Sequence, residues 1–393
     1  MKILMINSVC GIRSTGRICT DLAVALEKQG HEVKIAYGRE SVPEQFERYA
    51  IKIGSKLNVK MHGIETRFMD NSGFGSKNAT IEFIEWIKKF DPDIIHIHNI
   101  HGYYINIKEL FKYLKICQKK IYWTLHDCWS FTGHCAYFDY VGCEKWKECC
   151  FECVQKKEYP TSYFMDNSKR NYILKKEIFT HVPNMIIIVP SVWLFNLVKQ
   201  SFLKEYKVTL INNGVDTNVF RPKINKIREK YHCENKKIIL GVASVWDRRK
   251  GLDSFLDLST TLDERYQIIL IGLSKKQLKN LPKNIIGIER TDSVEQLAEY
   301  YSAADVFVNP TLEDNYPTTN LEAISCGTPV VTYNTGGSGE SASTFGVVVP
   351  KNNIEELKNK IIEVVEKGIQ KTGNINDKEM MLKLYINLFK NSL

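Results

Sequence analysis

The sequence lacks any long apolar run. No stretch of its 393 residues reaches the ~18 apolar residues that a membrane-spanning helix needs, and the run KILMIN at the start is too short for a signal peptide. We therefore expect a cytoplasmic protein whose 11 cysteines are reduced thiols or metal ligands. Long basic runs are missing too, although the net charge is +9, so a nucleic-acid partner is disfavoured.

Two further patterns are missing. The chain has no short-period repeat, and the loop after the first apolar run, NSVCGIRSTGRICT, has no GxGxxG pattern. A nicotinamide cofactor is therefore not expected. The same loop holds Gly11 and Gly16, which either permit a ligand to approach the backbone closely or are plain turn residues.

Short apolar runs alternate with amphipathic helical patterns along the chain. The runs fall at 2–7, 32–37, 93–98, 121–125, 185–189, 207–211, 237–243, 267–271, 305–309 and 329–333. Continuous apolar strands that alternate with helices predict parallel sheets covered on both faces. The pattern restarts near residue 237, so we expect two doubly wound α/β domains, 1–215 and 216–375, and a terminal helix at 376–393. Ligands of such sheets bind beyond the carboxyl ends of the strands, which favours a cleft between the domains.

The stretch LEDNYPTTNLEAISCGTPVV, residues 312–331, places two carboxylates around a helix start. Asp314 is expected in a loop, Thr318 as the N-cap of the helix, and Glu322 in its second turn. The amino end of a helix suits a phosphate, and carboxylates bind hydroxyl groups. The stretch therefore suits a sugar joined to a diphosphate, or else it is a capped helix with two solvated acids.

The stretch ASVWDRRKGLD, residues 243–253, follows an apolar run and opens a helix. It carries Arg248, Arg249 and Lys250 in succession. Because the positive end of the helix dipole disfavours cations there, three in a row indicate an anionic partner; a solvated basic helix start is the alternative.

Several other segments occur along the chain: PSVWL at 190–194, INNGVDTNVFRP at 211–222, LAEYYSAADVFVNP at 297–310 and NTGGSGE at 334–340. Together with the two acids, the RRKGLD segment and the CGTPVV break, this set resembles the retaining GT-B glycosyltransferases of family 4 over the whole chain. The resemblance implies two Rossmann-like domains that face each other across a cleft. It also implies that the N-terminal domain binds the acceptor and the C-terminal domain the nucleotide sugar.

The resemblance also implies residue roles. The first acid of the family binds the donor sugar and the second the ribose, which assigns these roles to Asp314 and Glu322; the family usually has glutamate at the first position. Lys250 matches the lysine that clamps the diphosphate. Val245 stands where the family has arginine, so Arg248 or, preferably, Arg249 supplies the second charge. The expected catalytic residues are His126, Lys250, Arg249 and Asp314, and the expected donor-binding residues are Gly16, Arg17, Arg248, Arg290, Pro317, Thr318, Thr319 and Glu322.

His126 matches the family histidine beside the donor sugar. It is expected to orient a hydroxyl group and not to act as a strong base, because the resemblance implies front-face attack assisted by the leaving phosphate. A buried core histidine is the alternative. Arg290, in the loop GIERTDS, is a candidate for contact with the nucleotide base.

A cysteine-rich insert spans residues 128–153 of the first domain. Its spacing fits four thiolates around a structural zinc ion, at Cys135, Cys143, Cys150 and Cys153, with a set of reduced thiols as the alternative. No catalytic metal is expected, because nothing resembles the Asp-x-Asp site of the other major glycosyltransferase fold and the basic cluster can replace Mg²⁺.

The resemblance implies a retaining, metal-independent enzyme that transfers a sugar from a nucleotide donor, a UDP sugar above all, to a hydroxyl of a growing glycan. The acceptor would be a lipid-linked oligosaccharide of a bacterial capsule, exopolysaccharide or O-antigen. Three alternatives remain: a nucleotide-sugar epimerase, a phosphorylase, and a zinc-stabilised binding module with a decayed donor site.

Peripheral attachment to the inner face of the cell membrane is a further expectation. The segment 56–78 is expected as a loop that either touches the membrane surface or is merely exposed. Its relevant residues are Phe68, Met69 and Phe74 near Lys56, Lys60, Arg67 and Lys77.

Overall fold

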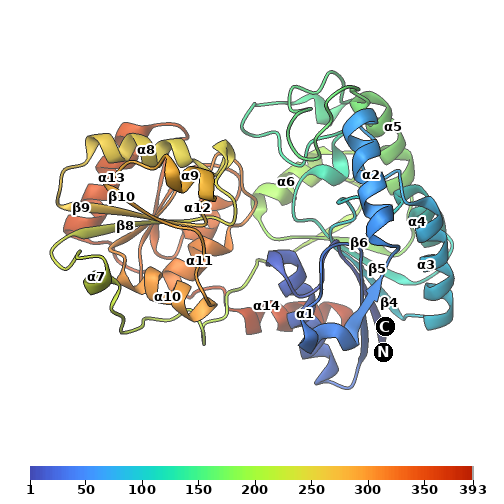
Figure 1. Ribbon diagram of the computed structural model, residues 1–393. Helices are drawn as coiled ribbons and strands as arrows, with labels where there is room; N and C mark the ends of the chain where they lie inside the picture. The colour runs from blue at the N-terminus through green and yellow to red at the C-terminus, as the bar shows by residue number, and fades with distance from the viewer. Residues whose placement is uncertain (392–393) are drawn as a thin grey trace. The chain divides into compact units, whose positions relative to one another are not determined.

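The computed structural model describes residues 1–391 and divides the chain into two compact units, each built on one parallel sheet (Figure 1). Unit 1 comprises Met1–Ile211 together with the chain from Leu382 onward, and unit 2 comprises Asn212–Met381. Residues 392 and 393 of the predicted terminal helix lie outside the described residues. The predicted fold class, two Rossmann-like α/β domains, is confirmed.

The sheet of unit 1 has seven parallel strands in the order β3-β2-β1-β4-β5-β6-β7. They are β1 (Lys2–Ile6), β2 (Glu32–Tyr37), β3 (Ala50–Lys52), β4 (Ile94–Ile97), β5 (Lys120–Thr124), β6 (Met185–Val189) and β7 (Lys207–Leu210). Residues 3 to 6 of β1 are all fully buried. Because successive side chains of a strand point to opposite faces, helices must cover both faces of this sheet.

The helices of unit 1 are α1 (Arg13–Glu27), α2 (Lys56–Met69), α3 (Lys77–Phe90), α4 (Ile107–Leu114), α5 (Ser168–Phe179) and α6 (Val192–Gln200). The expectation of a loop over 56–78 is therefore wrong, since most of this segment is α2. Ser55 explains why: its side chain accepts the N–H of Asn58, whose side chain in turn accepts the N–H of Ser55.

Unit 2 has six parallel strands in the order β10-β9-β8-β11-β12-β13. They are β8 (Lys237–Val242), β9 (Tyr266–Ile271), β10 (Ile285–Ile288), β11 (Val306–Asn309), β12 (Val330–Tyr333) and β13 (Gly346–Val349). Its helices are α7 (Ile227–Lys230), α8 (Leu252–Thr261), α9 (Lys275–Lys279), α10 (Val294–Ala303), α11 (Thr318–Ser325), α12 (Ser338–Ala342) and α13 (Ile354–Lys367). β8 and β11 are neighbours in the middle of the sheet, so their exit loops meet at one edge.

The last helix, α14 (Lys378–Lys390), begins in unit 2 and continues in unit 1. In unit 1 it packs on β5: the hydroxyl of Tyr385 lies 3.2 Å from that of Thr124, and Tyr122 donates to the carbonyl of Leu388. Phe389 is fully buried there. Within residues 1–391, none of the helices combines the length and the apolar character that crossing a membrane requires.

Candidate functional site

The loops that leave β8 and β11 bring a lysine and a carboxylate together in unit 2. Lys250 ends the short 3-10 helix η4 (Arg248–Lys250), and Asp314 lies in the loop between β11 and α11. Their side chains form an ion pair with 2.5 Å between Nζ and Oδ2, and both are partly exposed, at 23% and 14%. A positive and a negative group are thus available side by side to a ligand.

Backbone contacts hold these two loops together. The N–H of Leu312 donates to the carbonyl of Arg249 over 2.7 Å, and the guanidinium of Arg249 donates to the carbonyl of Glu313 over 2.9 Å. Gly251 has φ +77°, and a Cβ on it would lie 2.1 Å from the carbonyl oxygen of Pro310. The sequence RRKG therefore needs its glycine so that the two loops can approach each other.

The glycine pair of the segment NTGGSGE supports the loop of Asp314 from the other side. Gly336 has φ +52°, and a Cβ on it would lie 1.7 Å from the carbonyl oxygen of Asp314. The N–H of Gly337 donates to that oxygen over 3.3 Å. Any side chain at position 336 would displace Asp314, which explains why a glycine stands there.

Glu322 lies in α11 and is oriented by a tyrosine of the preceding helix. The hydroxyl of Tyr301, in α10, donates to Oε2 of Glu322 over 3.0 Å. Burial, reinforced by the charge of Glu322, holds the pKa of Tyr301 well above its usual value, so the hydroxyl remains a donor. The carboxylate itself is half-buried, with its orientation fixed by this bond.

The start of α11 differs from the prediction. Pro317 is the N-cap residue and makes no side-chain capping hydrogen bond, so the expectation that Thr318 caps the helix is wrong: Thr318 is its first residue. Thr318 and Thr319 are half-buried. Asn320 is fully buried, accepts from Asn309 and donates to Ser338 and Ser341, which ties α11 to β11 and α12.

The other predicted donor-binding cations of unit 2 are exposed. Arg248 precedes Arg249 in η4, and Arg290 follows β10. β10 is separated from β8 by β9, so Arg290 belongs to a different exit loop from that of Lys250. Val245 lies in the exit loop of β8, where the family has an arginine, and its side chain is 64% exposed.

In unit 1, His126 follows β5 and contacts His98, which follows the neighbouring strand β4. Nδ1 of His98 lies 3.0 Å from Nε2 of His126. Burial lowers the pKa of His126 to about 4, so its imidazole is neutral near pH 7. A small pocket at this edge is lined by both rings and by His101 and Asp127, whose side chains form a hydrogen bond with 2.9 Å between Nε2 and Oδ2.

The first turns of α1 carry the predicted Gly16 and Arg17. Gly16 is buried, and its carbonyl accepts the N–H of Gly11 over 3.1 Å. A Cβ on Gly16 would lie 3.1 Å from a methyl group of Val9, so this glycine lets α1 pack against the loop after β1. Arg17 is exposed. Since β1 is next to β4, this loop shares the sheet edge with His98.

The predicted zinc site is not formed by the side chains of residues 1–391, where no three His, Cys, Asp or Glu residues gather so that they could hold a metal ion. Cys135, Cys143, Cys150 and Cys153 do line one small pocket. However, Cys135 and Cys153 form a hydrogen bond with each other, and Cys150 accepts the N–H of Gly133 over 3.2 Å. The thiols therefore contact each other and the backbone.

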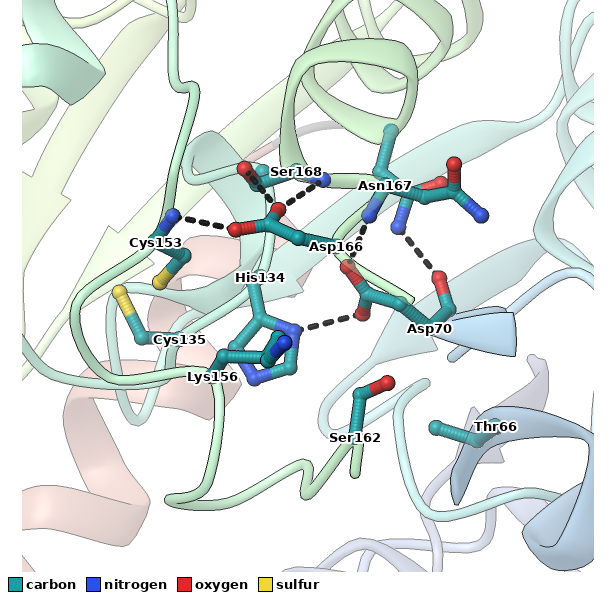
Figure 2. A network of polar contacts seen from close by, with 12 residues as sticks. Thr66, Asp70, His134, Cys135, Cys153, Lys156, Ser162, Asp166, Asn167 and Ser168 are labelled. Carbon is teal, nitrogen blue, oxygen red and sulfur yellow. Dashed lines mark hydrogen bonds and ion pairs between the residues drawn. The ribbon is translucent and has the colours of Figure 1, made fainter. Parts of the chain in front are cut away.

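A polar network that the sequence did not predict connects this insert to the rest of unit 1 (Figure 2). Nδ1 of His134 lies 2.5 Å from Oδ1 of Asp70, the C-cap residue of α2, and both side chains are fully buried. Asp166 accepts the N–H of Cys153 over 2.6 Å, and the sulfur atoms of Cys135 and Cys153 point toward each other. The network fixes the insert between α2 and the start of α5.

Comparisons with known proteins agree with this architecture. Residues 15–219 match the family model described as Glycosyltransferase Family 4, and residues 236–367 match the model described as Glycosyl transferases group 1. The colanic acid biosynthesis glycosyl transferase WcaC of Escherichia coli K12 is 24% identical over the full length of both chains. The E. coli UDP-Gal:alpha-D-GlcNAc-diphosphoundecaprenol alpha-1,3-galactosyltransferase is 25% identical over 48% of this chain and 52% of its own.

Two solved structures share the fold. The sucrose-phosphate synthase of Thermosynechococcus elongatus has a TM-score of 0.73 at 17% identity and covers 99% of this chain and 98% of its own. Anabaena HepE in complex with UDP has a TM-score of 0.67 at 14% identity, with complete coverage of both chains. At 17% and 14% sequence identity, the similarity to these two structures shows a shared fold and nothing more specific.

Proposed function

The chain belongs to Glycosyltransferase Family 4, and from this premise we propose that it transfers a sugar from a nucleotide diphosphate donor, a UDP sugar above all, to a growing bacterial surface glycan. The contact between Lys250 and Asp314 carries the proposal. A sugar diphosphate has a negative group next to hydroxyl groups, and this site offers an ammonium next to a carboxylate. Lys250 would bind the diphosphate and Asp314 a hydroxyl of the sugar.

The remaining groups of unit 2 would bind the rest of the donor. Glu322, oriented by Tyr301, would accept hydrogen bonds from the ribose hydroxyl groups. Thr318 and Thr319 begin a helix whose positive end suits a phosphate. Arg249, with Arg248 beside it, would add the second positive charge at the diphosphate, and Arg290 would approach the base.

We infer a retaining reaction without a catalytic metal. The acceptor hydroxyl oxygen bonds to the anomeric carbon on the face from which the diphosphate leaves, the bond between that carbon and the phosphate oxygen breaks, and the leaving phosphate takes the hydroxyl proton. Lys250 and Arg249 would stabilise the charge that develops on the diphosphate. His126 is neutral, which suits a group that orients a hydroxyl; Gly16 and Arg17 would face the donor phosphates and the acceptor.

The expected acceptor is a lipid-linked oligosaccharide. The similarity to WcaC over the whole chain supports a role in a bacterial exopolysaccharide. The galactosyltransferase that matches half of the chain is named for an acceptor on diphosphoundecaprenol. An enzyme with such an acceptor would work at the surface of the cell membrane.

Two measurements test the proposal. Titration calorimetry with UDP and GDP should show binding, with UDP the tighter ligand. A mass-spectrometric screen of nucleotide sugars should show slow hydrolysis of one UDP sugar without any acceptor, with retention of the anomeric configuration. Conversion of the sugar into its epimer would identify the epimerase instead. Binding of UDP without turnover of any donor, with or without lipid-linked acceptors, would identify the decayed module.

A further inference from the structure

Helix α2 carries an apolar face that points away from unit 1. Its exposed apolar residues recur at helical spacing along one side: Leu57, Met61, Ile64 and Phe68, which are 66%, 57%, 39% and 54% exposed. Single exposed apolar residues are normal on a protein surface, but a continuous row of four marks an interaction site. We call this row the α2 stripe.

The opposite side of α2 is fixed, so the stripe cannot turn inward. His62 is 2% exposed; burial lowers its pKa to about 4, and its Nε2 accepts the N–H groups of Gly73 and Gly75. Thr66, also buried, donates to the carbonyl of His62 over 2.9 Å. The bond of Thr66 lies within the helix, whereas the two bonds of His62 hold this side of α2 against the segment that follows it and leave the large apolar side chains outside.

A second segment extends the stripe at the end of α2. The rings of Phe68 and Phe164 stack with 4.9 Å between their centroids. The N–H of Met165 donates to the carbonyl of Phe68 over 3.2 Å, which holds the segment beside the helix. Phe164 and Met165 are 65% and 51% exposed. The apolar surface therefore continues from the helix onto a neighbouring part of the chain.

The charges beside the stripe are mainly positive. Lys56, Lys60 and Arg67 are exposed on α2, whereas the one acid of the helix, Glu65, is half-buried and accepts a hydrogen bond from Asn71. A second copy of the chain packed face to face on the stripe would bring these cations toward their own counterparts. An anionic surface would instead neutralise them, and an apolar layer beneath that surface would cover the stripe.

We propose that the α2 stripe, with Phe164 and Met165, lies in the headgroup layer of a membrane that contains anionic lipids. The helix would lie parallel to the membrane, with its apolar side chains among the upper acyl chains and with Lys56, Lys60 and Arg67 at the phosphates. This inference rests on the proposed function, because a lipid-linked acceptor explains why the enzyme would bind the membrane. The same binding would hold unit 1 where such an acceptor is found.

Flotation with vesicles at about 150 mM salt tests the inference on the full chain. Wild-type protein should float with phosphatidylglycerol–phosphatidylcholine vesicles and at least tenfold less with phosphatidylcholine alone. The variant Met61→Gln/Phe68→Gln should bind the anionic vesicles at least tenfold more weakly than wild-type protein. The matched control, Ile116→Gln/Ile224→Gln, removes two apolar side chains that are 71% and 104% exposed elsewhere and should bind like wild type. Lys56→Gln/Lys60→Gln should weaken binding about fivefold for each lysine.

Each other outcome overturns the inference. It fails if wild-type protein does not float, if the control loses as much binding as the stripe variant, or if neutral vesicles bind equally well. It also fails if light scattering finds a dimer that the stripe variant disperses, because the stripe then binds a second copy. All variants should keep the wild-type melting temperature and UDP affinity. If the wild-type protein does not bind UDP, the proposed function is refuted, whereas the flotation result still tests the membrane inference.

Discussion

Lys250 and Asp314 form an ion pair although 64 positions separate them in the chain. Three segments produce this contact: the exit loop of β8 carries the lysine, the exit loop of β11 carries the aspartate, and the glycine pair after β12 supports the aspartate from behind. A donor diphosphate would compete with Asp314 for the ammonium. Binding would therefore release the carboxylate to accept a hydroxyl of the sugar.

Replacing Lys250 with alanine should lower kcat for sugar transfer or donor hydrolysis by about a hundredfold or more, because the leaving diphosphate loses a positive charge in the transition state. The matched control is Lys275→Ala, which removes an exposed lysine at the start of α9 in the same unit. Steady-state kinetics at saturating donor measure the effect. An unchanged kcat in Lys250→Ala with equal melting temperatures contradicts the role.

Replacing Glu322 with alanine should chiefly weaken nucleotide binding. A hydrogen bond to a charged group contributes about 1.5–3 kcal/mol, so the Kd for UDP should rise about 10- to 100-fold. Tyr301→Phe removes only the group that orients the carboxylate and should raise the Kd less, by about two- to tenfold. Calorimetry with UDP measures both. A wild-type Kd in Glu322→Ala would exclude contact with the ribose.

The sequence predicted the architecture because apolar strands that alternate with amphipathic helices have few alternatives. It missed β3, β10 and β13, which are three of the four edge strands of the two sheets; the fourth, β7, was predicted at 207–211. Edge strands are buried less completely, and the burial pattern of β13 shows one buried residue in four. The missed strands are also short or contain glycine: β3 (AIK) has three residues, and β10 (IIGI) and β13 (GVVV) each include a glycine, which weakens a strand pattern.

The site was predictable only in part. The acids, the basic triplet and the glycines stand in recognisable segments, but the partner of Glu322 does not. Tyr301 lies in the sequence YYSAA as a residue of the apolar face of α10, and nothing in that pattern reveals that its hydroxyl reaches α11. His134 is a similar case, because its partner Asp70 lies 64 positions away. Tertiary contacts of this kind are not encoded in local spacing.

Unit 1 should lose stability when the pH falls from 6.5 to 5. Burial lowers the pKa of His62 and His126 to about 4, of His96 to about 3 and of His98 well below its usual value. The unfolded chain binds protons on these residues below about pH 6.5 while the folded chain does not, so acid favours unfolding. Each histidine should cost up to about 1.4 kcal/mol per pH unit in this window.

Urea denaturation at pH 7, 6 and 5 measures this effect through the free energy of unfolding. His134 does not offset this loss of stability. Burial lowers its pKa, but the hydrogen bond and charge of Asp70 outweigh burial and raise the pKa above the ordinary value. The stability that His134 contributes is therefore fully present below pH 6.5 and is lost only at higher pH. His62→Gln should reduce the dependence of the free energy of unfolding on pH by the contribution of one histidine, which is up to about 1.4 kcal/mol per pH unit. A free energy of unfolding that stays constant between pH 7 and 5 contradicts the prediction.

Cys153 should be the most reactive thiol of the insert. The hydrogen bond from Cys135, with the nearby charge of His134, lowers the pKa of Cys153 to about 7 despite its burial, whereas burial raises the pKa of Cys150 to about 12. At pH 7 about half of Cys153 is then thiolate, compared with a few per cent of an ordinary cysteine, and the thiolate is the nucleophile. Iodoacetamide at pH 7, followed by peptide mass spectrometry, should label Cys153 at least tenfold faster than Cys150.

Cys135→Ala removes the donor and should slow the labelling of Cys153 at pH 7 by about tenfold, with less effect at pH 9, where an ordinary thiol ionises as well. Cys117→Ala, at a half-buried cysteine after α4, is the control and should leave the rate unchanged. Equal labelling of Cys150 and Cys153 would contradict the effect of the hydrogen bond. Protection of all four cysteines that ends when a chelator is added would show a bound zinc ion instead, and it would mean that the thiol pair gives way to metal coordination.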